Sequence, residues 1–210
     1  MMTSDITTVI FDVGDVLLFD TGKGLFEDAA RAFGLGDDVA RVERVAGELI
    51  PLYQKGSIDE RTYWKIFAEG VGYVGQLPDD WRKLWRREFA RNIRRNEPVF
   101  DLARALRSAV YVTPILSNTI PPHVEVMNER GLLTGFEPAV FSCSVGMRKP
   151  EREIYLRTLG LAEVEDPATA VFIDDQSKYV DAARAVGMRG IHYQSFEQLC
   201  DELRSLGLQF

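Results

Sequence analysis

Cysteines are few in this chain, and long apolar runs and an excess of positive charge are missing altogether. The two cysteines among 210 residues, Cys143 and Cys200, are too few for a disulfide framework and suit a reducing cytoplasm. No segment approaches the roughly 18 to 20 apolar residues of a membrane span, and no basic-then-apolar stretch marks a secretory signal. A net charge of −7 argues against general affinity for nucleic acid. We therefore expect a cytoplasmic protein with neither a membrane nor a nucleic-acid partner.

Two sequence patterns divide what remains. Residues 20–95 carry only helix signals, with helices expected over 25–33, 39–53, 57–68 and 78–93. After Pro98 helices alternate with short β-branched runs, which predict strands at 110–116, 139–141, 170–173 and 190–193. A further strand precedes the helical segment and ends at about residue 11.

The helical segment has two local features that the structure can test. Ser57 and Glu60 have the spacing of a capping box, which predicts Ser57 as the N-cap of the third helix. The fourth helix carries an apolar stripe, expected to be core: Trp81, Leu84, Trp85, Phe89 and Ile93. It also carries a basic series: Arg82, Lys83, Arg86, Arg87, Arg91, Arg94 and Arg95. A surface for nucleic acid or an acidic partner is one interpretation of this series; we favour a solvated polar face, because the chain is acidic overall.

Alternation of helices and strands predicts an α/β fold, with a Rossmann-like parallel sheet and helices on both faces. The helical segment interrupts this alternation after the first strand. We therefore expect an α/β core made of residues 1–19 and 96–210, and an inserted all-helical cap, residues 20–95, that covers the strand ends as a lid.

The ends of the predicted strands and one loop carry polar residues that form a chemically coherent set: Asp12, Ser117, Asn118, Lys149, Asp174 and Asp175. In a parallel sheet flanked by helices, ligands bind beyond the carboxyl ends of the strands. Clustered carboxylates need a cation, and hard oxygen donors without His or Cys favour Mg²⁺. A lysine and a hydroxyl beside that ion form a receptor for a phosphoryl group, which a free carboxylate can attack.

Four stretches also resemble, in order, the motifs of the haloacid dehalogenase-like (HAD) hydrolase superfamily: Phe11–Leu17, Leu116–Thr119, Gly146–Pro150 and Phe172–Asp175. The helical segment lies between the first and the second, as in members with a helical cap. Residues 181–188 are also typical of the family. Each motif alone is weak, but their order and the placement of the insertion make the resemblance specific.

The resemblance implies a metal site. Asp12 matches the nucleophile, which is also a Mg²⁺ ligand in the family. The backbone carbonyl of Gly14 and the carboxylate of Asp175 match the other two ligands, and Asp174 has a supporting place beside them. Capping of the next helix is the alternative explanation of the Asp174–Asp175 pair.

The resemblance also implies a phosphate site. Ser117 and the backbone N–H of Asn118 match the groups that hold the phosphoryl oxygens, and Lys149 matches the residue that neutralises nucleophile and phosphate. Strand termination for Ser117 and a surface position for Lys149 are the structural alternatives. Taken together, these alternatives explain the whole set poorly.

Two positions depart from the family pattern. Gly14 stands where many members have an acid/base aspartate, whose help is typically worth about 10²- to 10⁴-fold in rate. The family includes apparent phosphatases with glycine at this position. Gly14 therefore predicts hydrolysis that is slower than in members with the aspartate. Asp15, one residue on, is a candidate substitute, although a shift by one turns the side chain elsewhere. Tyr179 occupies a place where many members have another acid.

Other residues are weaker candidates. Contact with substrate is one interpretation of His123, which follows the Ser117 loop; we favour a surface position at a helix start. His192 at the end of the last strand is expected to be structural. Asp20 and Lys23 enter the cap near the site and are candidates for substrate contact.

The leading hypothesis is a Mg²⁺-dependent phosphatase that hydrolyses a small phosphorylated metabolite, such as a sugar phosphate, through an aspartyl phosphate on Asp12. A 2-haloacid dehalogenase-type hydrolase is the enzymatic alternative, because it also attacks through this aspartate. A non-catalytic phosphate-binding module is a third hypothesis, owing to Gly14. A phosphotransferase or a mutase is a further hypothesis. No pattern in the sequence indicates the substrate or the oligomeric state.

Overall fold

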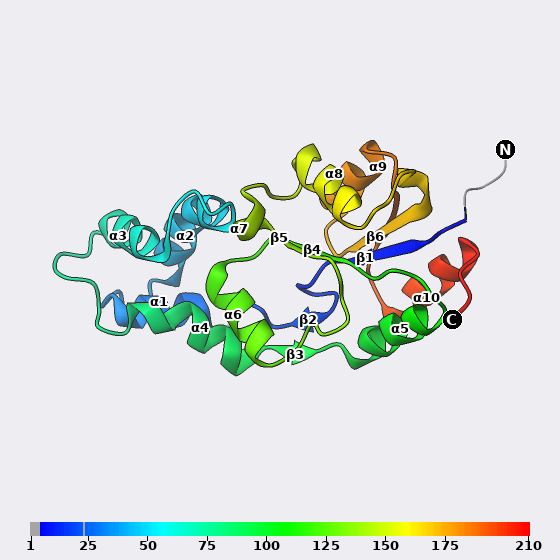
Figure 1. The fold of residues 1–210 in the computed structure, drawn as a ribbon. Coiled ribbons are helices and arrows are strands. Elements are labelled where there is room, and N and C mark those ends of the chain that lie inside the picture. The colour runs from blue at the N-terminus through cyan, green and yellow to red at the C-terminus, as the bar shows by residue number, and fades with distance from the viewer. Residues whose placement is uncertain (1–4, 23) are drawn as a thin grey trace.

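A five-stranded parallel sheet forms the centre of the molecule (Figure 1). The computed structural model describes residues 5–22 and 24–210. The strand order is β5-β4-β1-β6-β7, and every neighbouring pair is parallel. The strands are β1 (Thr8–Phe11), β4 (Ile115–Ser117), β5 (Ala139–Phe141), β6 (Ala170–Asp174) and β7 (Arg189–His192). Since β1, β4 and β6 are buried along their full length, their apolar runs suit a sheet covered on both sides.

Helices cover both faces of the sheet, as the sequence predicted. Alternate β1 side chains point to opposite faces. Val9 and Phe11 belong to a core with α5 (Glu97–Ser108) and α10 (Phe196–Ser205), and Ile10 belongs to a core with α8 (Arg152–Leu161) and α9 (Ser177–Ala185). Figure 1 shows these two helix pairs on either side of the strands. The helices of this α/β part are α5 (Glu97–Ser108), α6 (Pro121–Glu129), α7 (Ser142–Val145), α8 (Arg152–Leu161), the 3₁₀ turn η1 (Pro167–Thr169), α9 (Ser177–Ala185) and α10 (Phe196–Ser205). The predicted α/β class is confirmed.

Strand β4 is shorter than the sequence predicted. The expected strand began at residue 110, but Val110 is 92% exposed, with a φ of 67°, and β4 starts only at Ile115. Pro114 has no N–H to donate, so a regular ladder cannot run through it. Carbonyls of Val112 and Pro114 still accept hydrogen bonds from β1, which keeps this segment beside the sheet.

A helical module, formed by α1 (Leu25–Ala32), α2 (Val39–Gln54), α3 (Glu60–Gly70) and α4 (Trp81–Asn92), extends from one end of the sheet (Figure 1). It has its own apolar core, in which the rings of Phe33, Trp64, Phe67 and Trp85 meet. On α4 the predicted stripe is buried at Leu84, Trp85 and Phe89, while Trp81 and Ile93 lie at its half-buried ends. No helix among the described residues combines the length and hydrophobicity that crossing a bilayer requires.

The predicted capping box at Ser57 is wrong. Helix α3 begins at Glu60, and its N-cap is Asp59, whose Oδ1 accepts a hydrogen bond from the Thr62 N–H at 2.7 Å. Asp and Ser cap helices about equally well, so local spacing alone could not decide between the two.

Two short strands join the module to the α/β part, which the sequence did not indicate. β2 (Leu18–Phe19) pairs with β3 (Arg94–Arg95) in antiparallel fashion, so the outgoing and returning chains lie side by side. Just beyond the pair, Arg94 Nε lies 2.6 Å from an Asp20 carboxylate oxygen. A two-residue strand has too little pattern to be read from sequence. The expectation of purely helical structure over residues 20–95 is therefore wrong at its C-terminal end.

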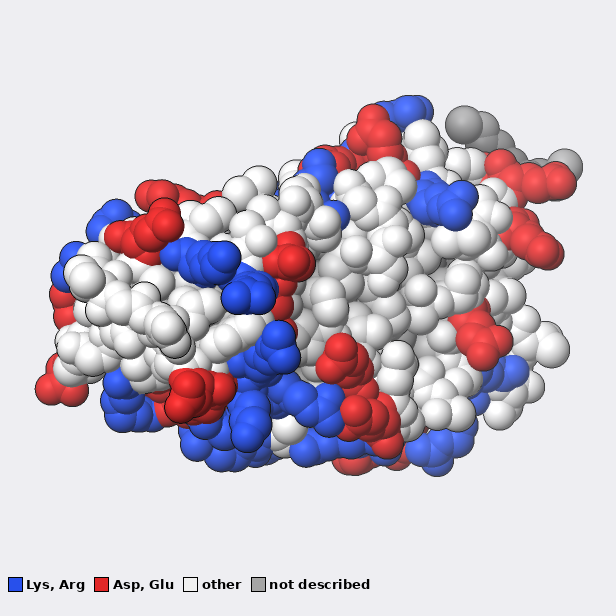
Figure 2. Space-filling view, turned by 60° about the vertical axis from the view of Figure 1, so that its left-hand side comes forward, with Lys and Arg blue, Asp and Glu red and all other residues white. Residues whose placement is uncertain are grey.

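Most of the basic side chains of the α4 region have acidic partners. Figure 2 shows Lys and Arg gathered along one edge of the molecule, with Asp and Glu between them. Ion pairs involve Arg86, Arg87, Arg91, Arg94 and Arg95. We favoured a solvated polar face for this basic series. The structure adds that much of the positive charge of this face is neutralised by acidic residues of the same chain.

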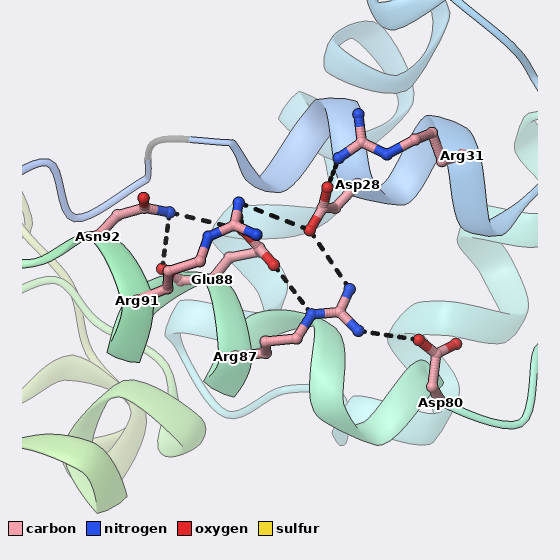
Figure 3. Close-up of polar contacts among 7 residues, drawn as sticks. All are labelled: Asp28, Arg31, Asp80, Arg87, Glu88, Arg91 and Asn92. Carbon is pink, nitrogen blue, oxygen red and sulfur yellow. Dashed lines mark hydrogen bonds and ion pairs between the residues drawn. The ribbon is translucent and has the colours of Figure 1, made fainter.

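The centre of this arrangement is a pair of buried carboxylates between α1 and α4 (Figure 3). Asp28 and Glu88 are 6% and 2% exposed. Arg87 donates to both of them, at 3.3 and 3.0 Å, and also reaches Asp80 at 3.0 Å. Arg91 also pairs with Glu88, and Arg31 with Asp28. Because buried carboxylates need such partners, this network fixes α1 against α4.

Candidate active site

The candidate site lies where three adjacent strands end. β1 ends just before Asp12, β4 ends in Ser117, and β6 ends in Asp174, with Asp175 next. In the sheet order β4 and β6 flank β1, so these residues share one edge. Asp12, Ser117 and Asp174 are at most 6% exposed, and Asp175 is half-buried. The side chains that the sequence placed at strand ends therefore come together.

Lys149 crosses this edge from the loop between α7 and α8. Its side chain is 1% exposed, and its Nζ lies 2.9 Å from Asp12 Oδ1 and 2.6 Å from Asp174 Oδ2. Burial alone lowers the pKa of Lys149, but attraction to Asp12 and Asp174 outweighs it, and the pKa lies above its usual range. The alternative of a surface lysine is excluded.

The lysine does not neutralise the acidic cluster. Oxygens of Asp12, Asp174 and Asp175 all lie within 4.8 Å of one another. Burial, and then the charge of Asp12, raise the pKa of Asp174 to about 7 against the opposing effect of Lys149. Burial and neighbouring carboxylates also raise the pKa of Asp175. An oxygen-lined site with excess negative charge suits a hard divalent cation.

The three carboxylates differ in how much of each is free. Asp174 uses Oδ2 on Lys149 and Oδ1 on the backbone N–H of Gln176, at 2.8 Å. Asp12 Oδ1 accepts from the Val13 N–H at 2.7 Å as well as from Lys149. The second oxygen of Asp12 and the carboxylate of Asp175 carry no hydrogen bond to another described residue. Both oxygens of Asp174 therefore have hydrogen-bond partners, whereas one oxygen of Asp12 and both oxygens of Asp175 have none among the other described residues.

The β4 loop fixes the position of Lys149. Asn118 Oδ1 accepts the Lys149 backbone N–H at 2.8 Å, and Asn118 Nδ2 donates to the Lys149 carbonyl at 3.0 Å. Ser142 holds the same loop, because its Oγ contacts both the N–H and the carbonyl of Thr119. Sequence reasoning missed these roles of the Asn118 side chain and of Ser142, since no local pattern reveals a partner 31 or 23 residues away.

The structure shows what surrounds Gly14 and Tyr179, the two positions that depart from the family pattern. A Cβ added at Gly14 would lie 3.6 Å from Thr21 Oγ1, an ordinary contact, so a side chain fits there. Asp15 adopts a φ of 54°, and burial followed by the charges of Asp12 and Asp20 raises its pKa. The ring of Tyr179 lies 5.0 Å from Lys149 Nζ, so an aromatic face covers the ammonium where other members place an acid.

The helical module contacts the α/β part on two sides of this edge. On one side, Phe89 of α4 stacks on His123 with centroids 4.0 Å apart, and Arg86 pairs with Glu125 and Glu129. On the other side, Arg148 Nη2 donates to Gln54 Oε1 at 3.0 Å. These contacts hold the module over the ends of the strands.

The second contact side includes the α2–α3 turn. Lys55 pairs with Glu151 at 3.1 Å. Gly56, with a φ of 67°, lies so near the Cys143 carbonyl that a Cβ would come within 2.8 Å of its oxygen. Residues flanking Lys149 are thus in contact with the module.

A cavity of about 220 Å³ lies between the module and the edge of the sheet that carries the candidate site. Thr21, Asn118 and Thr119 line its inner end, and Trp85 and Gln54 line it from the module. The cavity therefore adjoins the position of Gly14 and the loop that follows Ser117.

The two histidines have different surroundings. His123 was expected at the surface, but it is half-buried and lines the cavity; desolvation lowers its pKa to about 3, so it is neutral. His192 Nε2 donates to the Asp175 carbonyl at 2.8 Å, which accords with its expected structural role. Among the candidates for substrate contact, Asp20 pairs with Arg94, and Lys23 lies outside the described residues.

Comparison with known proteins adds a family and several relatives. The family model of the haloacid dehalogenase-like hydrolases matches residues 6–187. The sesquiterpene phosphatase AstK of Aspergillus oryzae is 25% identical over 206 residues, which cover 98% of each chain. Flavin mononucleotide hydrolase 1 of Arabidopsis thaliana is 39% identical over 67 residues. That match covers 32% of this chain and 27% of the plant protein, so this chain spans about a quarter of that relative.

Among solved structures, a HAD family enzyme of Bacteroides thetaiotaomicron in a magnesium complex has a similar fold. The TM-score is 0.76 at 21% identity, over 95% of this chain and 98% of the other. The same enzyme in complex with magnesium and inorganic phosphate gives a TM-score of 0.71. At this identity the likeness concerns the fold alone.

Proposed function

This chain belongs to the haloacid dehalogenase-like hydrolase family, and on that basis we propose that it is a Mg²⁺-dependent phosphatase of small phosphomonoesters. The proposed reaction proceeds through an aspartyl phosphate on Asp12. The observation that carries the proposal is the buried Lys149 ammonium held between Asp12 and Asp174, beside a third carboxylate. Two of the relatives are a phosphatase and a flavin mononucleotide hydrolase, which supports the same chemistry.

Mg²⁺ fits the residues present. The donors are carboxylate oxygens in a buried cluster, and their negative charge is larger than the positive charge of the one lysine beside them. Asp12, Asp175 and the backbone carbonyl of Gly14 would hold the ion, because the oxygens of Asp174 are engaged by Lys149 and Gln176. When bound, the ion neutralises charge on the phosphoryl oxygens. The Bacteroides enzyme of similar fold forms a complex with magnesium and inorganic phosphate, which supports Mg²⁺ as the ion.

Asp12 is oriented for attack by the contacts of its other oxygen. Val13 N–H and Lys149 hold Oδ1, which leaves Oδ2 as the nucleophile. A bond forms between Oδ2 and phosphorus while the bond from phosphorus to the ester oxygen breaks. Water then attacks the phosphorus, releases phosphate and restores the carboxylate. Lys149 offsets the negative charge that gathers on the transferring group, and the Ser117 hydroxyl with the Asn118 N–H orients its oxygens.

Gly14 makes proton transfer the weak step. The leaving oxygen needs a proton, and position 14 has no side chain to supply one, so water must do so. We therefore expect low turnover with poor leaving groups. The helical module acts as the cap in this proposal, since the cavity between it and the sheet adjoins the site. The free state of Cys143 and Cys200 supports a reducing cytoplasm as the location.

The acidic cluster also favours a phosphatase over the dehalogenase alternative. A 2-haloacid carries its own carboxylate, and Asp174 and Asp175 would repel it unless a cation intervened. A phosphoryl group bound with Mg²⁺ meets no such repulsion.

The test is release of phosphate from an aryl phosphate with Mg²⁺, in the wild type and in Asp12→Asn. We expect the substitution to lower kcat by at least about 10³-fold, because it removes the nucleophile. Asp181→Asn is the matched control, since Asp181 is an exposed residue of α9 that pairs with Arg184. A chelator should abolish wild-type turnover. Undiminished activity of Asp12→Asn would contradict the mechanism, and chelator-resistant turnover would contradict the role of Mg²⁺.

A further inference from the structure

The cavity under the helical module has mostly apolar walls. Leu25, Phe26, Ile50 and Ile120 line it together with the indole of Trp85. Under the proposed function, on which this inference rests, the alcohol part of the ester occupies this space, because the cavity adjoins the β4 loop and Gly14. Apolar walls gain free energy from burying an apolar alcohol.

The described lining of this cavity includes no charged side chain. Its polar members are Thr21, Asn118, Thr119, Gln54 and His123. His123 is neutral at physiological pH because it is desolvated against Phe89. A carboxylate or a second phosphate on the substrate would lose its hydration here without gaining a counter-ion from the described lining residues. The cavity therefore disfavours esters whose alcohol part is anionic.

Gln54 adds one directional polar group. Arg148 can only donate hydrogen bonds, so the atom that faces its Nη2 at 3.0 Å must be the oxygen of the Gln54 amide. The NH₂ group is then left without a partner among the described residues. A donor that lacks an acceptor matches a ligand that brings one.

The volume of the cavity matches a small alcohol. About 220 Å³ corresponds to roughly seven waters at about 30 Å³ each. A short branched chain or a single ring fits such a space.

We infer that this cavity selects monophosphate esters of small, uncharged, largely apolar alcohols, and that Gln54, oriented by Arg148, recognises a hydrogen-bond acceptor on the alcohol. Gln54 is then a specificity-determining residue, and Arg148 is a positioning residue that acts through it. The inference favours alkyl and aryl monophosphates over sugar phosphates, because the larger part of the surface that lines the cavity is apolar.

The experiment compares three esters of similar length: pentyl phosphate, 3-methoxypropyl phosphate and 4-phosphonooxybutanoate. The first is apolar, the second replaces one methylene with an ether oxygen, and the third ends in a carboxylate. With Mg²⁺ and wild-type protein, kcat/KM for the carboxylate should be at least about tenfold below that for pentyl phosphate. The ether should exceed pentyl phosphate by roughly three- to tenfold, the effect of one neutral hydrogen bond.

Variants assign the ether preference to Gln54. Gln54→Leu should reduce the ether-to-pentyl ratio of kcat/KM to about one. Arg148→Met should lower the same ratio, since the Gln54 amide loses its fixed orientation. Lys55→Met is the matched control: Lys55 is the next residue, it pairs with Glu151 and does not line the cavity, and its variant should keep the wild-type ratio. Because each ratio is taken within one protein, it does not depend on the folded fraction.

Failure of this inference differs from failure of the proposed function. If no ester, including an aryl phosphate, releases phosphate with Mg²⁺, the phosphatase assignment is refuted and this inference with it. If phosphate is released but the carboxylate ester is preferred, the charge selection is overturned while the phosphatase assignment stands. An unchanged ether-to-pentyl ratio in Gln54→Leu overturns the role of Gln54.

Discussion

At the scale of single residues, Lys149 shows how the site combines opposite demands. A buried ammonium is costly, yet Asp12 and Asp174 lie within 2.9 Å of it and hold it charged. Sequence reasoning placed these residues at one edge, because the carboxyl ends of parallel strands share an edge. It could not find the side-chain clamp of Asn118 on Lys149, which depends on a contact between distant loops.

The missing side chain at position 14 leads to a prediction about rate. Gly14→Asp should raise kcat by roughly 10- to 100-fold, part of the full effect of general acid/base catalysis. The structure has room for the change, as the nearest atom to the new Cβ would be 3.6 Å away. Steady-state kinetics with an alkyl phosphate measure it best, since a poor leaving group needs the proton most.

Gly14→Asn is the control, because it has the same shape without a transferable proton. Equal rates for the Asp and Asn variants would show that position 14 does not limit turnover.

His123 predicts how stability depends on pH. Its folded pKa of about 3 lies below the ordinary value of 6.5, so between these values the unfolded chain binds a proton that the folded chain does not. Stability from this group is therefore complete above pH 6.5 and is lost as the pH falls. In His123→Phe this loss should disappear. Between pH 7.5 and pH 5 the free energy of unfolding should therefore fall by roughly 2 kcal/mol less in the variant than in the wild type. Urea unfolding of both proteins at pH 7.5 and pH 5 measures the difference, and parallel pH profiles would contradict it.

At the scale of elements, the helical module depends on charge as well as on its apolar core. Periodicity predicted the helices, and the buried stripe of α4 is as expected at Leu84, Trp85 and Phe89. Periodicity could not predict that Arg87 forms ion pairs with two buried carboxylates, since Asp28 lies 59 residues earlier in the chain. The N-cap at Asp59 and the short β2–β3 pair were missed because competing or very short patterns carry little information.

Removal of Arg87 should therefore destabilise the module. Arg87→Met should lower the free energy of unfolding by about 1 to 3 kcal/mol, below the full cost of breaking a buried pair because Arg87 is half-exposed. Lys83→Met on the same helix should change it by at most about 0.5 kcal/mol. The three tryptophans, Trp64, Trp81 and Trp85, all lie in the module, so urea unfolding followed by tryptophan fluorescence reports on it directly. Equal midpoints for the two variants would contradict the role of the network.

At the scale of the whole molecule, the module and the sheet enclose the site from two sides. The α4–α6 contact and the α2–α7 contact flank the cavity, so its shape depends on how closely the module approaches the sheet. The α/β class was predictable from the order of helices and strands. The contact surfaces were not, because they depend on packing between segments far apart in the chain.

Gly56 tests whether this approach matters for catalysis. In Gly56→Ala the new Cβ would come within 2.8 Å of the Cys143 carbonyl oxygen, which should push the module outward and lower kcat/KM by about tenfold. Gly34→Ala is a matched control: its φ of 66° is nearly that of Gly56, but its Cβ would meet no atom within 4 Å. Both variants should lose about 1 kcal/mol of stability from the left-handed backbone. Equal kcat/KM in the two variants would show that close approach of the module is unimportant.

The central claim, covalent capture of phosphate by Asp12, is tested most directly by acid quench and peptide mass spectrometry. Wild-type protein turning over an aryl phosphate with Mg²⁺ should yield a phosphorylated peptide containing Asp12, because Gly14 leaves the second step without a base and the intermediate accumulates. The same peptide from Asp12→Asn should carry no phosphate. Steady release of phosphate by wild type while Asp12 stays unmodified at every quench time would contradict the account.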